Sequence, residues 1–176
     1  MRTITAAAAV FAAFATIPAC GGSTSPTNNP GESATCTVTL SGAVSGTYDC
    51  KPATTVWSSA NNRGGFSFSV GTSGSTPNIN VAIAWTGEPA AGTHYQRTDA
   101  GAQGGVTLIT GSGAGTQVWE AVTGNNATGS YDLDFTSVSN ALSTANGKAY
   151  TADGALDATL NPTTGQNGSV TVHVSF

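Results

Sequence analysis

The sequence predicts an all-β domain, folded as an antiparallel β-sandwich of about ten short strands, with a closed β-barrel as the alternative. Three observations support this prediction. Only 8% of the 176 residues are charged, against about 25% in ordinary soluble domains, which leaves too few charges for a coiled coil or a long solvated helix. Large apolar residues alternate with Ser, Thr, Asn or Asp, which is the period of a half-buried strand. Turn residues, among them 23 Gly, interrupt the chain about every ten residues.

Residues 1–19 predict an export signal. Met1 and Arg2 give a short positive start, and an apolar stretch without a charge follows up to Pro18. This layout is that of a secretory signal, and the stretch is too short to cross a membrane as a helix. Export would place the remaining chain where disulfides form and persist.

The segment Ile17-Pro18-Ala19-Cys20 resembles the lipobox of bacterial lipoproteins, in which aliphatic and small residues precede a Cys. The resemblance implies that the signal is cut before Cys20 and that this residue is linked to diacylglycerol. More than one acyl chain would give stable membrane anchoring. Gly21 in place of Asp after the Cys implies the outer membrane. The alternative is ordinary secretory cleavage nearby, with Cys20 as a bystander.

Residues 20–34 comprise Cys20 and a segment rich in Gly, Ser, Asn and Pro. Because this segment has no large apolar side chain, we expect a flexible tether. Residues 35–176 have the usual size of one domain and are expected to form the β-sandwich. In composition and layout this domain is similar to uncharacterised small β-sandwich lipoproteins of Gram-negative bacteria.

Alternation places the strands in order along this domain. It is clearest in residues 35–40, 66–70, 79–85, 131–135 and 170–176. Further candidate strands are residues 47–57, 93–97, 105–110, 116–122, 148–152 and 155–160. Within these runs we expect Trp85 and Tyr131 on the core face and His173 on the polar face.

The chain has three Cys. If Cys20 carries lipid, Cys36 and Cys50 remain as an even pair. A hairpin centred on Ala43 would place these two Cys opposite each other, as a disulfide requires. We therefore predict a structural disulfide that stabilises the fold by about 3 kcal/mol in the chain-entropy treatment. A redox-active or metal-binding pair is disfavoured, because CxxC spacing and a nearby His are missing.

Catalytic motifs are absent from the sequence. The two His residues, His94 and His173, are accompanied by no G-x-S-x-G motif, so a Ser–His–acid hydrolase is not expected. The Gly-rich segment 111–115 opens no predicted helix and therefore lacks an anion site. With 5 Lys and Arg against 9 Asp and Glu, we expect no nucleic-acid partner. The sequence predicts no enzyme and no cofactor.

Carboxylates could also form a glycosidase pair or a calcium site. Candidates for the glycosidase pair are Glu88, Glu120 and Asp99, but no motif pairs any of them with another, and Glu88 and Glu120 are more simply solvent-facing charges. For calcium, the candidates are Asp132 with Asp134, which share the face of an expected strand, and Asp153 with Asp157, which flank the start of another. No calcium-loop spacing surrounds either pair, so solvated carboxylates are the default and calcium is the alternative.

Exposed aromatic rings would indicate glycan binding, because they stack on sugar faces. Trp57, Trp119 and Tyr95 are the candidates, although aromatic residues in strands more often belong to the core. The leading prediction is a non-enzymatic, lipid-anchored protein of the cell envelope whose β-sandwich is a structural or interaction module. Its partners would be the membrane, through Cys20, and an envelope protein or a glycan. A glycan- or calcium-binding module is the alternative, and a secreted hydrolase comes third.

Overall fold

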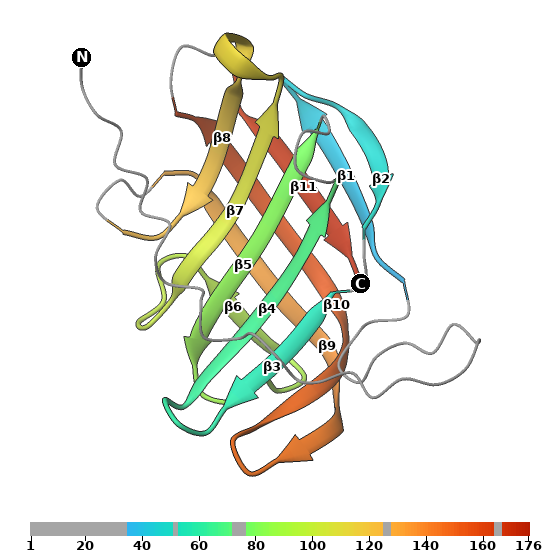
Figure 1. Cartoon of the computed structure of the whole chain (residues 1–176), viewed down its shortest axis with the longest axis vertical. Helices are drawn as coiled ribbons and strands as arrows, with labels where there is room; N and C mark the ends of the chain where they lie inside the picture. The colour runs from blue at the N-terminus through green and yellow to red at the C-terminus, as the bar shows by residue number, and fades with distance from the viewer. Residues whose placement is uncertain (1–34, 51–52, 72–76, 125–127, 164–166) are drawn as a thin grey trace.

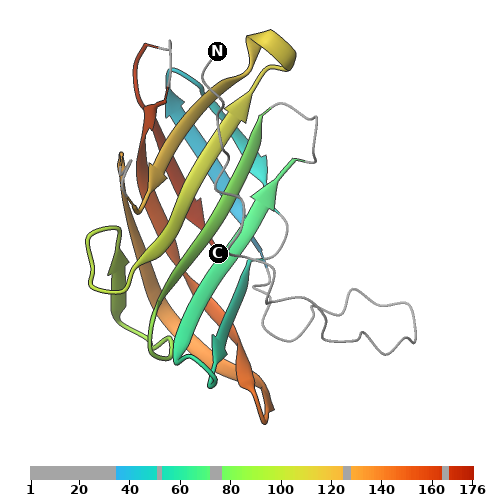
Figure 2. The ribbon, with the colours of Figure 1, turned by 60° about the vertical axis from the view of Figure 1, so that its left-hand side comes forward.

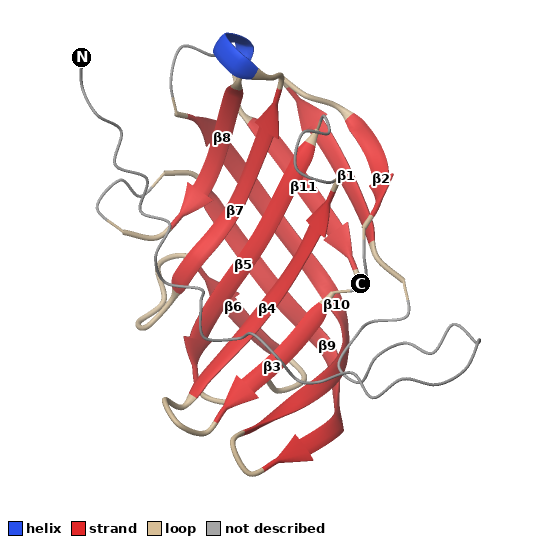
Figure 3. Cartoon of the chain, viewed as in Figure 1, coloured by secondary structure: helices blue, strands red, loops and turns tan. Residues whose placement is uncertain are grey.

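A computed structural model of the chain describes residues 35–50, 53–71, 77–124, 128–163 and 167–176. The predicted signal 1–19, the lipobox with Cys20 and the tether up to residue 34 lie outside the described residues. Strands dominate the described part of the chain, and its helical structure is one short 3-10 turn, Gly113–Gly115 (Figure 3). Within these ranges, no helix has the length and apolarity needed to cross a membrane.

The fold is all-β, as predicted, and its strand pairings are antiparallel. The strands are β1 (Thr37–Gly42), β2 (Gly46–Asp49), β3 (Thr54–Ser58), β4 (Arg63–Val70), β5 (Asn78–Thr86), β6 (Thr93–Gln96), β7 (Gln103–Thr110), β8 (Gln117–Val122), β9 (Ser130–Thr144), β10 (Gly147–Pro162) and β11 (Val170–Ser175).

The strands form two layers that face each other and cross obliquely (Figures 1 and 2). One layer has the order β3-β4-β5-β7-β8, and the other has the order β6-β9-β10-β11-β1-β2. The long strand β10 connects the layers, because residues 147–150 pair with β3 and residues 161–162 pair with β8. The predicted sandwich-like arrangement is therefore confirmed, with both layers joined into one hydrogen-bonded sheet.

The core lies between the two layers, where alternate residues of each strand point inward. Phe66 of β4 contacts rings from the opposite layer, with centroids 6.0 Å from Phe135 and 4.4 Å from Phe176. Aromatic pairs of this kind contribute about 0.5–1.5 kcal/mol beyond their buried area. Trp85 and Tyr131 are each only 3% exposed, which confirms their predicted place in the core. The outward-facing residues are therefore the ones free to meet a partner.

The hairpin of β1 and β2 carries the predicted disulfide. Leu40 pairs with Gly46 and Thr37 with Asp49, so the hairpin is centred on Ala43 as expected. Cys36 and Cys50 are bonded, with their Cα atoms 5.1 Å apart. The Cys50 N–H donates to the Cys36 carbonyl oxygen over 3.0 Å, which continues the ladder up to the disulfide.

Two strand predictions differ from the structure. The expected strand 47–57 is divided into β2 and β3. The expected strands 148–152 and 155–160 are one continuous strand, β10, because Asp153 and Gly154 form a register shift against β9 rather than a turn. Gly154 passes so close to the Asp134 carbonyl that a Cβ would clash there. An Asp-Gly pair thus bends β10 without ending it, as β-bulges do.

Candidate functional site

A row of polar side chains crosses the outer face of the layer that contains β9 and β10. Gln96 of β6 lies opposite Asp132 of β9. Asp132 lies opposite Asp157 of β10, and Asp157 lies opposite His173 of β11. Residues directly opposite each other on antiparallel strands have Cβ atoms about 4.5–5.5 Å apart. Strand register therefore places two carboxylates side by side, an arrangement that is destabilising unless other charges compensate it.

This row belongs to a groove of about 540 Å³ on the same face. The groove is lined by Thr39, Ser41, Gln96, Arg97, Thr98, Ser130, Tyr131, Asp132, Asp157, Ala158, Thr159, Thr171, Val172 and His173. Hydroxyl groups dominate this lining, and two carboxylates, one amide, one guanidinium and one imidazole accompany them. The groove therefore offers many hydrogen-bond donors and acceptors to a polar partner.

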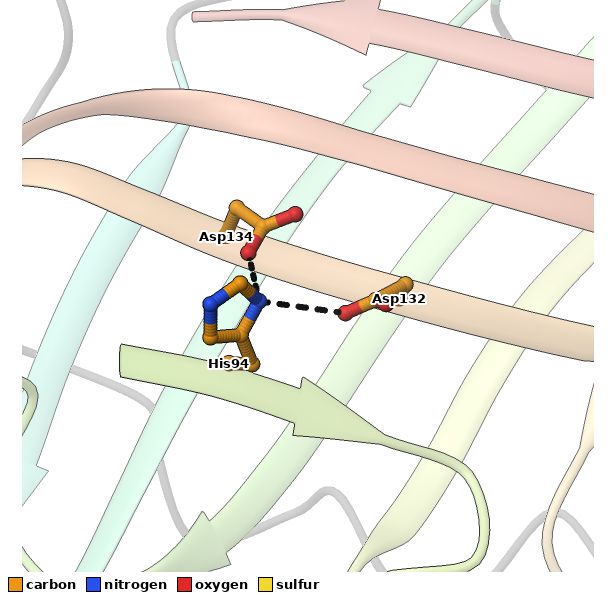
Figure 4. A group of neighbouring side chains, drawn as sticks. All are labelled: His94, Asp132 and Asp134. Atoms are coloured by element: carbon orange, nitrogen blue, oxygen red, sulfur yellow. Dashed lines mark ion pairs between the residues drawn. The ribbon is translucent and has the colours of Figure 1, made fainter. Parts of the chain in front are cut away.

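His94, Asp132 and Asp134 converge at one end of this polar row, and we call them the His94 trio (Figure 4). His94 of β6 lies directly opposite Asp134 of β9. The Nδ1 atom of His94 pairs with Oδ1 of Asp134 and lies 3.9 Å from Oδ1 of Asp132. One ligand atom from each residue lies within 4.8 Å of the others, so the trio has the size of a metal-binding group.

Asp132 is oriented by a neighbour of the trio. Its Oδ2 atom accepts a hydrogen bond from Nε2 of Gln96 over 2.8 Å. Its Oδ1 atom is shielded from solvent and has no hydrogen-bond donor in the part of the chain that the structure describes. One oxygen of this carboxylate is thus fixed by Gln96, while the other faces His94 without a donor.

The residues predicted as calcium candidates separate into different environments. Asp132 and Asp134 share a strand face, as expected, but His94 joins them. Asp153 accepts a hydrogen bond from the Ser137 hydroxyl over 2.6 Å, whereas Asp157 pairs with Nδ1 of His173 over 2.7 Å. Of the residues that the structure describes, only the His94 trio forms a group of three that could hold a metal ion.

A second charged group, which we call the Glu88 cluster, contains Glu88, Lys148 and Tyr150. Oε1 and Oε2 of Glu88 accept hydrogen bonds from Nζ of Lys148 over 3.0 and 2.9 Å. Oε2 also accepts one from the Tyr150 hydroxyl over 2.6 Å. The hydrogen bonds from Tyr150 and Lys148 hold the pKa of Glu88 below its usual range. Burial and the hydrogen bond to Glu88 raise the pKa of Tyr150. Glu88 is exposed, as expected from the sequence, and its charge is also paired with Lys148.

The other carboxylates proposed for a glycosidase pair have separate surroundings. Asp99 accepts a hydrogen bond from the Gln96 backbone N–H over 2.7 Å, within a turn. Glu120 of β8 lies opposite Thr107 and Asn161. Burial raises the pKa of Tyr131 to about 12, and the negative charge of Asp99 contributes to this rise. Glu88, Asp99 and Glu120 therefore each have different neighbouring residues.

The three candidate sugar-stacking aromatics do not form a common platform. Trp119 is 2% exposed and donates to the Gly168 carbonyl over 3.1 Å, so its ring is in the core and unavailable for stacking. Tyr95 is half-buried and stacks on Trp85, with centroids 4.1 Å apart. Trp57 is half-buried too, and the ammonium of Lys148 lies 5.3 Å from its ring centroid. None of these rings lines the groove.

Sequence reasoning missed the His94 trio because β6 and β9 are distant in the chain. Alternation along the sequence places Asp132 and Asp134 on one face, but it does not indicate that β6, with His94, is the neighbouring strand. No protein-family model matches the chain, and no curated protein or solved structure matches it significantly. Function therefore has to be inferred from the residues themselves.

Proposed function

We propose that this protein is a non-enzymatic, lipid-anchored interaction module of the cell envelope, attached to the outer membrane through Cys20. The lipobox Ile17-Pro18-Ala19-Cys20 supports the anchor. The cysteine count supports it as well, because the Cys36–Cys50 disulfide uses two of the three Cys and leaves Cys20 for the lipid. An acyl anchor would hold the domain at the membrane without any contribution from the sandwich.

The polar groove is the observation that carries the binding role. Its floor consists of outward-facing side chains from β1, β9, β10 and β11, such as Thr39, Thr159 and Thr171. The backbone of paired strands is fixed by the hydrogen-bond ladder, so little backbone freedom is lost when a partner binds. A rigid groove rich in hydroxyl groups favours recognition of a polar partner.

Metabolic labelling with a palmitate analogue tests the anchor. We expect label on the wild-type chain and none on Cys20→Ala. The matched control is the double variant Cys36→Ala and Cys50→Ala, which removes the disulfide and is expected to keep its label. Equal labelling of wild type and Cys20→Ala would overturn the lipid anchor.

A glycan is the partner that the groove favours among envelope components. Sugars present many hydroxyl groups, and the lining supplies matching hydroxyls, carboxylates, an amide and a guanidinium. We expect one member of a panel of soluble envelope polysaccharides to bind the wild-type chain, and Thr39→Trp to abolish that binding by filling the groove. Thr151→Trp is the matched control, because Thr151 is an exposed strand residue outside the groove. Equal binding by both variants would remove the groove from the proposal.

A further inference from the structure

We propose that the His94 trio binds a divalent transition-metal ion of the zinc class, with Nδ1 of His94 and one oxygen each of Asp132 and Asp134 as ligands. This site does not depend on the lipid anchor, and it shares Asp132 with the lining of the groove. It rests on three features of the described residues: the positions set by strand register, the excess of negative charge, and the chemistry of the donor atoms.

Strand register fixes the ligands before a metal binds. His94 and Asp134 are directly opposite on β6 and β9, and Asp132 lies two residues away on the same face. The three ligand atoms lie within 4.8 Å of one another. Tetrahedral zinc bonds of about 2.0–2.1 Å place neighbouring ligand atoms roughly 3.3 Å apart. The trio therefore needs only side-chain adjustment to surround one ion.

The local charge favours a cation. Asp132 lies beside Asp134 along β9 and opposite Asp157 across β10, so three carboxylates are neighbours on one face. His94 and His173 are the basic partners of these carboxylates. With both His neutral, Asp132, Asp134 and Asp157 carry three negative charges, and no Lys or Arg of the described residues forms an ion pair with them. A divalent ion at the trio would compensate two of them.

Asp132 provides an independent indication of a ligand. The Asp132 side chain is 38% exposed, but its Oδ1 atom is shielded from solvent and receives no hydrogen bond from any described residue, and a shielded oxygen without a partner is costly. Oδ1 faces Nδ1 of His94 (Figure 4). A metal ion between these atoms would satisfy the oxygen. Nε2 of Gln96 would orient the carboxylate from outside the ligand set, as hydrogen-bond partners of metal ligands do.

The donor atoms distinguish zinc from calcium. Calcium takes six to eight oxygen ligands, whereas the trio offers one nitrogen and two carboxylate groups. Imidazole and carboxylate are good ligands for Zn²⁺. The His94 side chain is 66% exposed, so water would complete the coordination shell. The trio is therefore better suited to a four-coordinate ion than to calcium.

Isothermal titration of the untagged full chain in detergent with ZnCl₂ tests the site. We expect saturable binding of one Zn²⁺ per chain and no comparable binding of CaCl₂. His94→Ala and Asp134→Asn each remove a ligand atom and should abolish the saturable binding. Gln96→Ala removes only the orienting hydrogen bond, so we expect a loss of affinity of roughly 10- to 100-fold.

Asp153→Asn is the matched control, because Asp153 is a carboxylate of β10 outside the trio, where it accepts a hydrogen bond from the Ser137 hydroxyl. It should bind Zn²⁺ as the wild type does. His94 is exposed, so its substitution leaves the core intact, and a circular dichroism spectrum checks the fold of each variant. Absence of saturable Zn²⁺ binding, or binding retained in His94→Ala, would overturn the proposal. Equal binding of CaCl₂ would overturn the assignment to the zinc class.

Discussion

Two charged groups on the surface of the sandwich differ in how completely their charges are paired. In the Glu88 cluster, one carboxylate meets one ammonium and one phenol hydroxyl, all within 3.0 Å. Lys148 also lies over the ring of Trp57. Every polar group in this cluster has a partner, so its role is structural. It ties the loop after β5 to β10.

The His94 trio and the neighbouring Asp157 have no such balance. Asp132, Asp134 and Asp157 are neighbours, and among the described residues only two imidazoles form ion pairs with them. One oxygen of Asp132 lacks a hydrogen bond from the described residues. Natural folds keep few unpaired buried polar atoms. The contrast with the Glu88 cluster therefore supports the proposal that the trio binds a metal ion.

Of the substitutions considered, Tyr150→Phe should lower stability most, because it removes the hydrogen bond from a buried residue of the Glu88 cluster to the Glu88 carboxylate. Tyr150 is 5% exposed, and its hydroxyl is the inner donor to Glu88. We expect the melting temperature to fall by roughly 2–4 °C, the shift that one net hydrogen bond produces in a domain of this size. Thermal unfolding followed by circular dichroism measures it.

The control for this prediction is Tyr48→Phe, since Tyr48 is a half-buried tyrosine outside the cluster. Its melting temperature should stay near that of the wild type. An equal fall in both variants would mean that the Tyr150 hydrogen bond adds nothing specific.

Acid should weaken the Glu88 cluster by a smaller amount. The pKa of Glu88 is held below its ordinary value of 4.5 by Tyr150 and Lys148. A carboxyl with a lowered folded-state pKa stabilises the fold above its unfolded pKa, and that contribution is lost as pH falls through the folded pKa. We therefore expect the difference in melting temperature between wild type and Glu88→Gln to be largest near neutral pH and to shrink below pH 4.5. A constant difference would show that the charge of Glu88 is not responsible.

Sequence patterns predicted the parts of this fold that depend on neighbouring residues. Alternation identified the strands, and the spacing of Cys36 and Cys50 around Ala43 identified the disulfide. The patterns failed at Asp153-Gly154, where the expected break between two strands is a bulge within one strand, because β9 pairs with β10 on both sides of it. They could not predict the His94 trio, since alternation says which way a side chain faces but not which strand lies beside it.

Without metal, Asp132→Asn should change the free energy of unfolding least, and the direction of this change shows whether the carboxylate stabilises the fold. Without metal, the variant removes a carboxylate that lies opposite Asp157, while the Asn oxygen can still accept the hydrogen bond from Gln96. Relief of a like-charge pair is worth about 0.2–1 kcal/mol, so we expect a small rise in the free energy of unfolding. Urea unfolding in the presence of a chelator measures it.

Zinc should reverse the order of stability of the wild type and Asp132→Asn. At a concentration a hundredfold above Kd, a ligand that binds only the folded state adds about 2.7 kcal/mol of stability. The wild type should then be more stable than Asp132→Asn, because only the wild type retains the complete trio. Asp134→Asn is the control, since it loses the ion pair with His94 and should be no more stable than the wild type in either condition. If Asp132→Asn is the less stable protein even with the chelator, the carboxylate stabilises the fold by itself, and the contrast between the two charged groups disappears.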